Sequence, residues 1–268
     1  MKKQKSNYWE ERAAASQNKI TDLNIGKVQN ILKRYYSKTL DKTLDSFEKV
    51  YLRIFHNITE GQEITPADLY KLDRYWKLQG DLQRELQKLG DKEVELLTQS
   101  FIQQYEMVYK GLAIEGESFF STLDSGAAKQ MINQIWCADG KAWSQRVWDN
   151  LAKLQQELND NLVQCIIAGR NTSFLKKSLM ERFNVSYNRA NTIVRTEMAH
   201  IQTQAAADRY KSYGISKYMF LADPDERTCD ICGSLDRKEF YFAEMQVGVN
   251  APPMHPNDRC CIVPVVED

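Results

Sequence analysis

Apolar residues recur every three or four positions through most of the first two thirds of the chain, which is the spacing of one helical face. Lys27–Ile58 shows this spacing without any Gly or Pro and predicts a long helix. Thr65 and Pro66 then supply an N-cap and a first helical residue. The amphipathic pattern continues to about Ile114 and predicts two helical pieces that meet near Gly90.

The middle of the chain carries a continuous helical stripe. A helix is expected to begin at Asp124 or Ser125, and Asp139 is the predicted cap of the next one. Gly169 is expected to end that next helix. Its predicted buried stripe at 3.6-residue spacing consists of Trp143, Val147, Leu151, Leu154, Leu158, Leu162 and Cys165. Since Cys165 lies on the stripe, we expect a buried, unreactive thiol there.

The pattern changes near Gly214. Before it, short helices are predicted over Ser173–Phe183 and Ser186–Tyr213. After it, alternating or β-branched runs predict three strands, in KYMFLAD, KEFYF and IVPVV. We therefore predict a mainly α protein with a small α+β C-terminal unit, in which helices pack on a short antiparallel three-strand meander. The predicted domains are a helical arm or bundle over residues 1–125 and a second domain over 126–268.

Charge and hydropathy exclude several classes of function. Lys+Arg and Asp+Glu both number 36, so the sequence has no overall polyanion-binding charge. No apolar run is long enough for a membrane anchor, and no apolar segment follows the basic N-terminus, so a reducing cytoplasm is the expected place of synthesis. Two basic segments could still touch DNA phosphates without reading sequence. The candidate contacts are Lys2, Lys3, Lys5, Lys33, Arg34, Lys176, Lys177 and Arg182.

Cysteine and histidine gather in the last forty residues. Cys229 and Cys232 form a Cys-x2-Cys pair, and His255, Cys260 and Cys261 follow after a long spacer. Two thiolates on one turn with a later His/Cys pair suit a structural zinc ion. Unmetallated packing thiols, a redox or catalytic thiol, and disulfides are the alternatives. A thioredoxin-type motif is not expected, because GSLDRKEF follows the pair and does not predict a helix.

Several motifs occur in the order found in one family. RTCDIC, LDRKEF and NAPPMHPNDRC resemble the C-terminal signature of the phage minor head proteins, the Mu F-like head-morphogenesis family. IWCADGKAWSQRV and the helix containing Arg195, Thr196 and Glu197 also resemble that family, so the resemblance covers about Met131–Val265. The family usually ends in His-Pro-Asn-Cys-Arg-Cys, whereas Asp258 occupies the position of the first of those cysteines here.

This departure leaves the fourth zinc ligand open. We predict Cys229, Cys232, His255 and Cys260 as the ligands, with Asp258 or Cys261 as alternatives to Cys260. Arg195, Thr196 and Glu197 are expected to make local structural contacts, with Glu197 linking its helix to the C-terminal unit.

The resemblance implies a minor structural protein of a tailed-phage head, located in the virion near the portal. It would bind portal protein, and could also contact major capsid or scaffolding protein and packaged DNA. Its expected role is head assembly, DNA packaging or ejection, without catalysis. The alternatives are a zinc-dependent nucleic-acid enzyme or toxin, which would use Glu197 and His200, and a DNA-binding zinc module.

Overall fold

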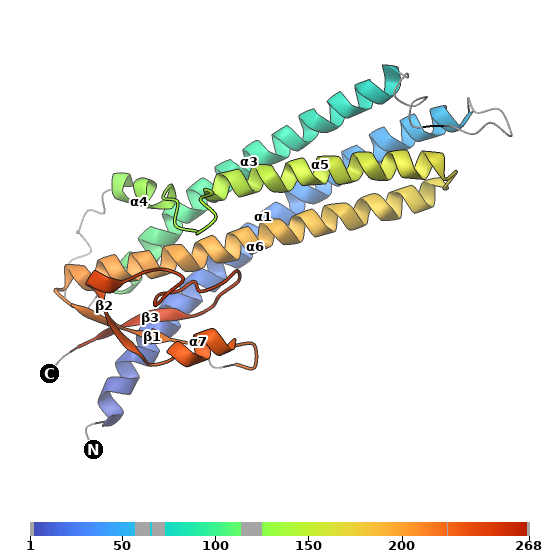
Figure 1. Ribbon diagram of the computed structural model, residues 1–268. Helices are drawn as coiled ribbons and strands as arrows, with labels where there is room; N and C mark the ends of the chain where they lie inside the picture. The colour runs from blue at the N-terminus through green and yellow to red at the C-terminus, as the bar shows by residue number, and fades with distance from the viewer. Residues whose placement is uncertain (1–2, 57–64, 66–72, 114–124, 224, 267–268) are drawn as a thin grey trace. The chain divides into compact units, whose positions relative to one another are not determined.

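The protein is mainly helical, with a small antiparallel sheet near its C-terminus (Figure 1). The structure is a computed structural model that describes residues 3–56, 65, 73–113, 125–223 and 225–266. This confirms the predicted fold class. The helices are α1 (Lys3–His56), α3 (Asp73–Gly111), α4 (Ser125–Ile132), α5 (Trp143–Ile167), α6 (Thr172–Ser212) and α7 (Asp230–Leu235), with a 3-10 turn at Phe242–Glu244. The strands are β1 (Lys217–Leu221), β2 (Glu239–Tyr241) and β3 (Cys261–Val265).

The chain packs into two compact units. The sheet unit comprises Met1–Gln29, Leu96–Trp143 and Thr192–Asp268, and the helical unit comprises Asn30–Glu95 and Ser144–Asn191. Both units combine segments from either side of residue 125. The predicted division into domains at that residue stays a prediction.

The helical unit is built from long apolar stripes. Leu154, Leu158 and Leu162 of the predicted α5 stripe are fully buried, and Cys165 is buried beside them. Leu32 of α1 is also fully buried. Burying one such side chain contributes about 1.5–3 kcal/mol, so packing along these stripes dominates the stability of the unit. Gly169 ends α5 with a positive φ of 57°, as predicted.

Four predicted helix boundaries are wrong. The first is the cap at Asp139, because α5 begins only at Trp143. Helix α1 begins at Lys3 and not at Lys27, and α3 runs through Gly90 without a break. The two short helices predicted after residue 172 are one helix, α6. The sequence contains no proline around Gly90 or between Phe183 and Ser186. Gly90 is tolerated within α3 because packing outweighs its weak helix propensity. The predicted helix start at Pro66 lies outside the described residues.

The sheet has the strand order β2-β1-β3, so the predicted meander is wrong. Strand β1 is central and pairs antiparallel with both neighbours, with Met219 opposite Val263 and Phe220 opposite Ile262. The long connection from β2 to β3 returns the chain to the free edge of β1. That connection carries His255, so the strand order brings it back toward the Cys-x2-Cys turn after β1.

Helix α1 fixes one face of this sheet within the sheet unit (Figure 1). Ala14 packs with Cys261 and Val263. The buried amide of Gln17 donates to the Ile262 carbonyl at 3.1 Å and to the Tyr210 hydroxyl of α6 at 3.0 Å. Helix α1 therefore holds β3 in place directly, and α6 supports it through Gln17.

Candidate metal centre

The Cys-x2-Cys pair forms the start of a short helix. Cys229 is the N-cap of α7, and its Sγ accepts a hydrogen bond from the backbone N–H of Cys232 at 3.4 Å. The prediction that no helix follows the pair is therefore wrong. The cap geometry points both sulfur atoms toward the same side of the turn, and the Cys232 N–H lowers the pKa of the Cys229 thiol.

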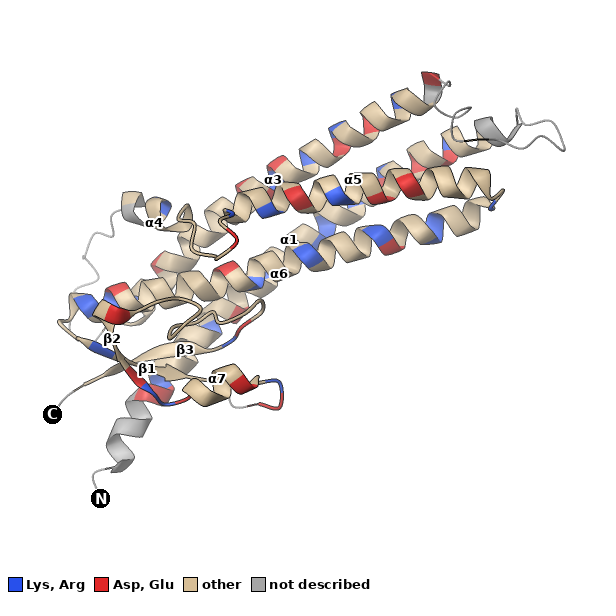
Figure 2. Cartoon of the chain, viewed as in Figure 1, with Lys and Arg blue, Asp and Glu red and all other residues tan. Residues whose placement is uncertain are grey.

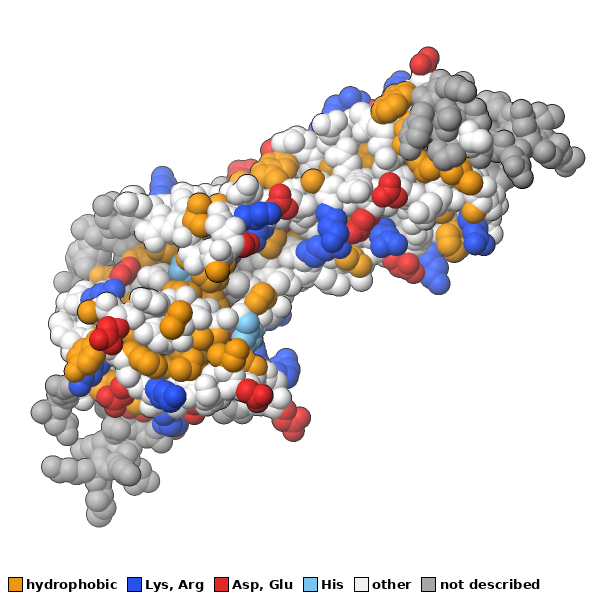
Figure 3. All heavy atoms as spheres, in the orientation of Figure 1, with side chains coloured by type: hydrophobic (Ala, Val, Ile, Leu, Met, Phe, Trp, Pro, Cys, Tyr) orange, Lys and Arg blue, Asp and Glu red, His pale blue; other side chains and the backbone are white. Residues whose placement is uncertain are grey.

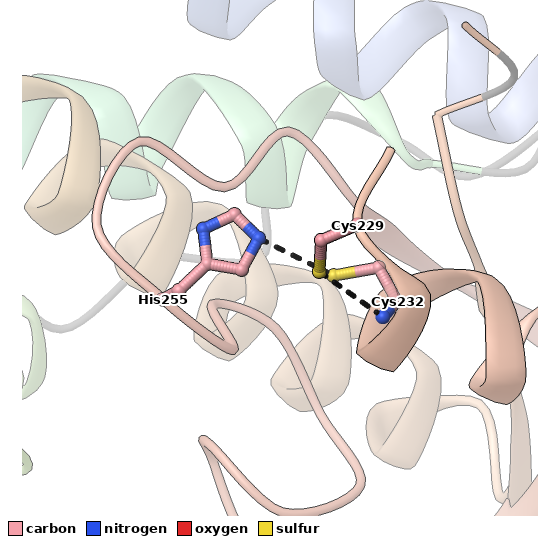
Figure 4. A group of neighbouring side chains, drawn as sticks. All are labelled: Cys229, Cys232 and His255. Atoms are coloured by element: carbon pink, nitrogen blue, oxygen red, sulfur yellow. Dashed lines mark hydrogen bonds between the residues drawn. The ribbon is translucent and has the colours of Figure 1, made fainter. Parts of the chain in front are cut away.

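His255 joins this pair to form what we call the Cys/His centre, which consists of Cys229, Cys232 and His255 (Figure 4). The ligand atoms of the three residues all lie within 4.8 Å of one another. His255 Nε2 lies 3.5 Å from Cys232 Sγ. Two such donors on one tetrahedral zinc ion are about 3.6 Å apart when the bond lengths are those usual for zinc. The observed spacing fits a shared ion.

The orientation of the imidazole ring also fits a metal ligand. His255 Nδ1 lies 3.0 Å from the Pro256 carbonyl oxygen. A carbonyl only accepts hydrogen bonds, so Nδ1 is the protonated nitrogen in this contact and Nε2 of the neutral ring presents its lone pair to the thiols. A hydrogen bond from the second ring nitrogen commonly orients histidines that bind metals. The same contact raises the pKa of His255.

Asp258 and Cys260 form a second group with Cys232. The Asp258 carboxylate oxygens accept the backbone N–H of Met254 at 2.7 Å and that of Cys260 at 2.9 Å. They lie 3.9 and 4.0 Å from Cys232 Sγ. Burial raises the pKa of Cys232 to about 12 and also raises that of Cys260. In the metal-free chain these two thiols are therefore protonated.

The remaining cysteines lie elsewhere. Cys261 points to the opposite face of β3, where it packs with Ala14 and Val263, and burial raises its pKa to about 12. Cys165 is buried in the helical unit and donates to Asn161 Oδ1 at 3.5 Å. Cys137 is half-buried. None of these three belongs to a metal-binding group among the described residues.

Charged residues that the sequence did not mark as functional support the centre. The Arg259 guanidinium pairs with the carboxylates of Asp223 and Asp225, at 2.6 Å for the latter, and Arg227 pairs with Asp225 at 2.9 Å. These ion pairs join the turn before Cys229 to the segment after His255. Charges at these positions were visible in the sequence, but their pairing across more than thirty residues was not.

The side chains of Arg195, Thr196 and Glu197 in α6 lie in three different surroundings within the sheet unit. Arg195 lines the pocket beside the Cys/His centre. Thr196 Oγ1 accepts the backbone N–H of Asn257 at 3.1 Å. The Glu197 carboxylate accepts the indole N–H of Trp136 at 2.9 Å. Thr196 therefore contacts the C-terminal loop, and the link predicted for Glu197 stays a prediction.

His200 is buried next to this segment. Its ring stacks on Trp136 with centroids 4.4 Å apart, and neither ring nitrogen has a hydrogen-bond partner among the described residues. Burial lowers the pKa of His200 to about 3, so the ring is neutral at physiological pH. The environment is that of a packed core histidine.

The candidate DNA contacts lie on helices. Lys33 and Arg34 of α1 and Lys177 and Arg182 of α6 are exposed, whereas Lys176 pairs with Glu48 at 2.8 Å. Lys2 and the side chains of Lys3 and Lys5 lie outside the described part of the chain. Lys/Arg and Asp/Glu side chains are interspersed along α3, α5 and α6 (Figure 2). Within the described ranges, no helix has the length and hydropathy of a membrane span.

A family profile described as Phage Mu protein F like protein matches residues 156–263. The match confirms the resemblance that the sequence motifs indicated. It runs from α5 through α6 to β3, and therefore includes the Arg195-Thr196-Glu197 segment and the Cys/His centre. No curated protein and no solved structure matches the chain significantly.

Proposed function

Because residues 156–263 match the family model of Phage Mu protein F like proteins, we propose that the chain is a minor structural protein of a tailed-phage head. The observation that carries this proposal is the family match across α6 and the Cys/His centre. We place the protein in the virion near the portal, where it would act in head assembly or in DNA packaging and ejection.

Exposed apolar side chains support a role in binding other proteins. Ile231, Tyr241, Val249 and Val266 of the sheet unit are each at least half exposed. Hydrophobic side chains are visible over the strands and loops of this unit (Figure 3). Where such side chains form a contiguous patch, they mark protein interaction sites. The proposed partner is the portal protein, with major capsid or scaffolding protein as further candidates.

Disrupting the gene in the phage tests this role. We expect loss of infectious particles, rescue by the wild-type chain, and recovery of the chain with portal protein from partly assembled heads. Electron microscopy of the particles would separate an assembly defect from an ejection defect, because only the latter leaves DNA-filled heads. Full infectivity of particles that lack the chain would contradict the proposal.

We also propose that the Cys/His centre holds a structural zinc ion. Cys229, Cys232 and His255 would bind it, and its positive charge would stabilise the two thiolates and join α7 to the loop before β3. A three-strand sheet buries little surface, so such a link adds stability that the core alone does not supply. Cys260 as fourth ligand, with Asp258 as the alternative within the second group, stays a prediction.

Elemental analysis of the purified chain tests the zinc proposal. We expect about one zinc per chain in the wild type, and loss of that zinc in Cys229→Ser. Cys137→Ser is the matched control, because this thiol lies outside the centre, and it should retain the metal. A wild-type chain without metal would remove the zinc proposal and leave the head-protein proposal intact.

The positions of Glu197 and His200 favour a non-catalytic role. An enzyme that used them would need both groups to reach a substrate, but Glu197 is 4% and His200 is 3% exposed. The Glu197 carboxylate is also occupied by the Trp136 indole. We therefore expect phosphodiesterase and transferase assays of the zinc-loaded chain to give no turnover that depends on Glu197.

A further inference from the structure

We propose that the Cys/His centre keeps one coordination position open to a pocket, where a phosphate-class oxyanion binds with Arg195 as its counter-charge. The proposal rests on the proposed metal ion and goes beyond a purely structural role for it. A zinc site with three protein ligands leaves its fourth position to a ligand from outside, whereas a four-ligand site is closed. The number of protein ligand atoms that lie close enough to share one ion therefore decides whether the centre is open or closed.

Three donors converge, and the predicted fourth does not join them. The ligand atoms of Cys229, Cys232 and His255 lie within 4.8 Å of one another, but Cys260 falls in the separate group with Cys232 and Asp258. Among the described residues, no group of four donors meets this distance. Donors on one tetrahedral zinc ion lie about 3.6–3.8 Å apart, so Cys260 would have to move to complete the shell.

Asp258 and Cys260 both have other roles that oppose such a movement. The two Asp258 oxygens accept the backbone N–H groups of Met254 and Cys260, which shapes the loop before β3. Cys260 is 4% exposed and packs with Phe220 and Ala222 in an apolar cluster that also includes Cys232. Drawing either side chain onto the ion would break buried hydrogen bonds or apolar packing.

A pocket of about 400 Å³ lies beside the centre and is lined by Cys229, Cys232 and His255, with Asp258 and Cys260 also in its wall. Three arginines line it. Arg259 and Arg227 are paired with the carboxylates of Asp223 and Asp225. Arg195 has neither a hydrogen bond nor an ion pair with any residue that the structure describes. Its guanidinium is thus the available cation of the pocket.

Charge and geometry point to an oxyanion as the ligand. Zinc with two thiolates and a neutral imidazole carries no net charge, whereas a third thiolate would make the centre anionic. Asp258 also lines the pocket, but its two oxygens accept the backbone N–H groups of Met254 and Cys260, so the Arg195 guanidinium is the group that can pair with an anion. The planar guanidinium fork matches the spacing of phosphate or carboxylate oxygens. Helix α6 holds Arg195 next to Thr196, which contacts the loop that carries His255.

Visible absorption of the full chain loaded with Co²⁺ tests the proposal. We expect inorganic phosphate at constant ionic strength to change the Co²⁺ bands saturably, with acetate as the carboxylate comparison. Arg195→Met should weaken the phosphate response at least about ten-fold while the phosphate-free spectrum is unchanged. Arg227→Met is the matched control, because this arginine already pairs with Asp225, and its response should stay within about two-fold of the wild type.

Cys260→Ser, or Cys260→Ala if the serine variant does not fold, distinguishes the open centre from the closed one. The open centre predicts an unchanged Co²⁺ stoichiometry and an unchanged phosphate response. Loss of Co²⁺ or of thiolate charge-transfer intensity in this variant, together with no phosphate response in the wild type, would overturn the open centre and leave the zinc proposal standing. A wild-type chain that takes up no metal would overturn both.

Discussion

Glu93 is a buried carboxyl group in the helical unit. It is 0% exposed, and its Oε2 accepts the Tyr36 hydroxyl of α1 at 3.1 Å. Oε1 has no hydrogen-bond partner among the described residues. Asn150 of α5 extends the network by donating to the Tyr36 hydroxyl and to the Ser186 carbonyl of α6. Burial raises the pKa of Glu93 to about 7, because the charged form would lose its hydration.

This raised pKa makes the stability of the helical unit depend on pH. The pKa of the folded state lies above the unfolded value of 4.5, so the stabilisation is complete below about pH 4.5 and is lost as pH rises through about 7. Glu93→Gln removes this dependence and keeps an acceptor for Tyr36. We expect the wild type to lose about 3 kcal/mol relative to Glu93→Gln between about pH 5 and pH 8.5.

Urea unfolding followed by circular dichroism at the two pH values measures the difference. Glu95→Gln is the control, because Glu95 lies two residues further along α3 and is exposed. It should follow the wild type at both pH values. If the free energy of unfolding changed with pH by the same amount in the wild type and in Glu93→Gln, Glu93 would be charged in the folded chain throughout this range.

Packing also decides the continuity of α3. A Cβ atom at Gly90 would overlap the Trp148 ring of α5 and lie 2.9 Å from Leu151 Cδ1, whereas at Gly80 it would meet only Arg84, at 3.6 Å. Gly90→Ala should therefore lower the free energy of unfolding by about 1–3 kcal/mol. Gly80→Ala should raise it by up to about 1 kcal/mol through helix propensity. Thermal melting of both variants checks these opposite signs, and stabilisation by Gly90→Ala would contradict the close helix approach.

The loop before β3 is organised by its own hydrogen bonds. The Asp258 carboxylate holds Met254 and Cys260, and Thr196 holds Asn257. We expect wild-type chain treated with EDTA to resist limited proteolysis at residues 252–260. Asp258→Ala should lose this resistance without metal, because two hydrogen bonds to a charged acceptor together contribute about 3 kcal/mol.

Asp230→Ala is the control for this loop, since Asp230 is exposed in the first turn of α7. It should retain the resistance. Equal protease sensitivity of metal-free wild type and Asp258→Ala would mean that metal, and not the carboxylate, orders the loop.

The periodicity of apolar residues in the sequence predicted the helices and strands that bury one face. The α5 stripe ending at Cys165 and the three strands were found because their apolar spacing follows the fold directly. The continuity of α6, the strand order and the contact between Thr196 and Asn257 depend on neighbours that are distant in sequence. The Cys/His centre was predictable from spacing, but the use of Asp258 as a backbone acceptor was not, because a carboxylate at that position serves equally well as a ligand.

At the scale of the whole molecule, the region that matches the family profile includes parts of both the helical unit and the sheet unit. Residues 156–263 include the C-terminal part of α5, all of α6 and the Cys/His centre. Helix α6 contributes Ser186 to the helical unit and Thr196 to the sheet unit. A single helix therefore carries contacts that stabilise both units.

Electrostatics limits how strongly this chain can bind DNA. The net charge is zero, and the exposed candidates in the helical unit are Lys33, Arg34, Lys177 and Arg182. Four phosphate contacts would give a slope of about −4 or shallower in a plot of log affinity against log salt. We expect the chain to bind duplex DNA weakly, with an affinity that falls along this slope between about 50 and about 200 mM NaCl. Fluorescence anisotropy measures this affinity.

Neutralising two of these cations tests the assignment directly. The double variant Lys177→Gln/Arg182→Gln should reduce the slope by about 2, because two fewer counterions are released from DNA on binding. The control is Lys42→Gln/Lys88→Gln, in which both lysines already pair with Glu85 and contribute little to DNA binding. Binding that did not weaken with salt would exclude phosphate contacts by these helices. The proposed role in a phage head would then rest on contacts with other proteins alone.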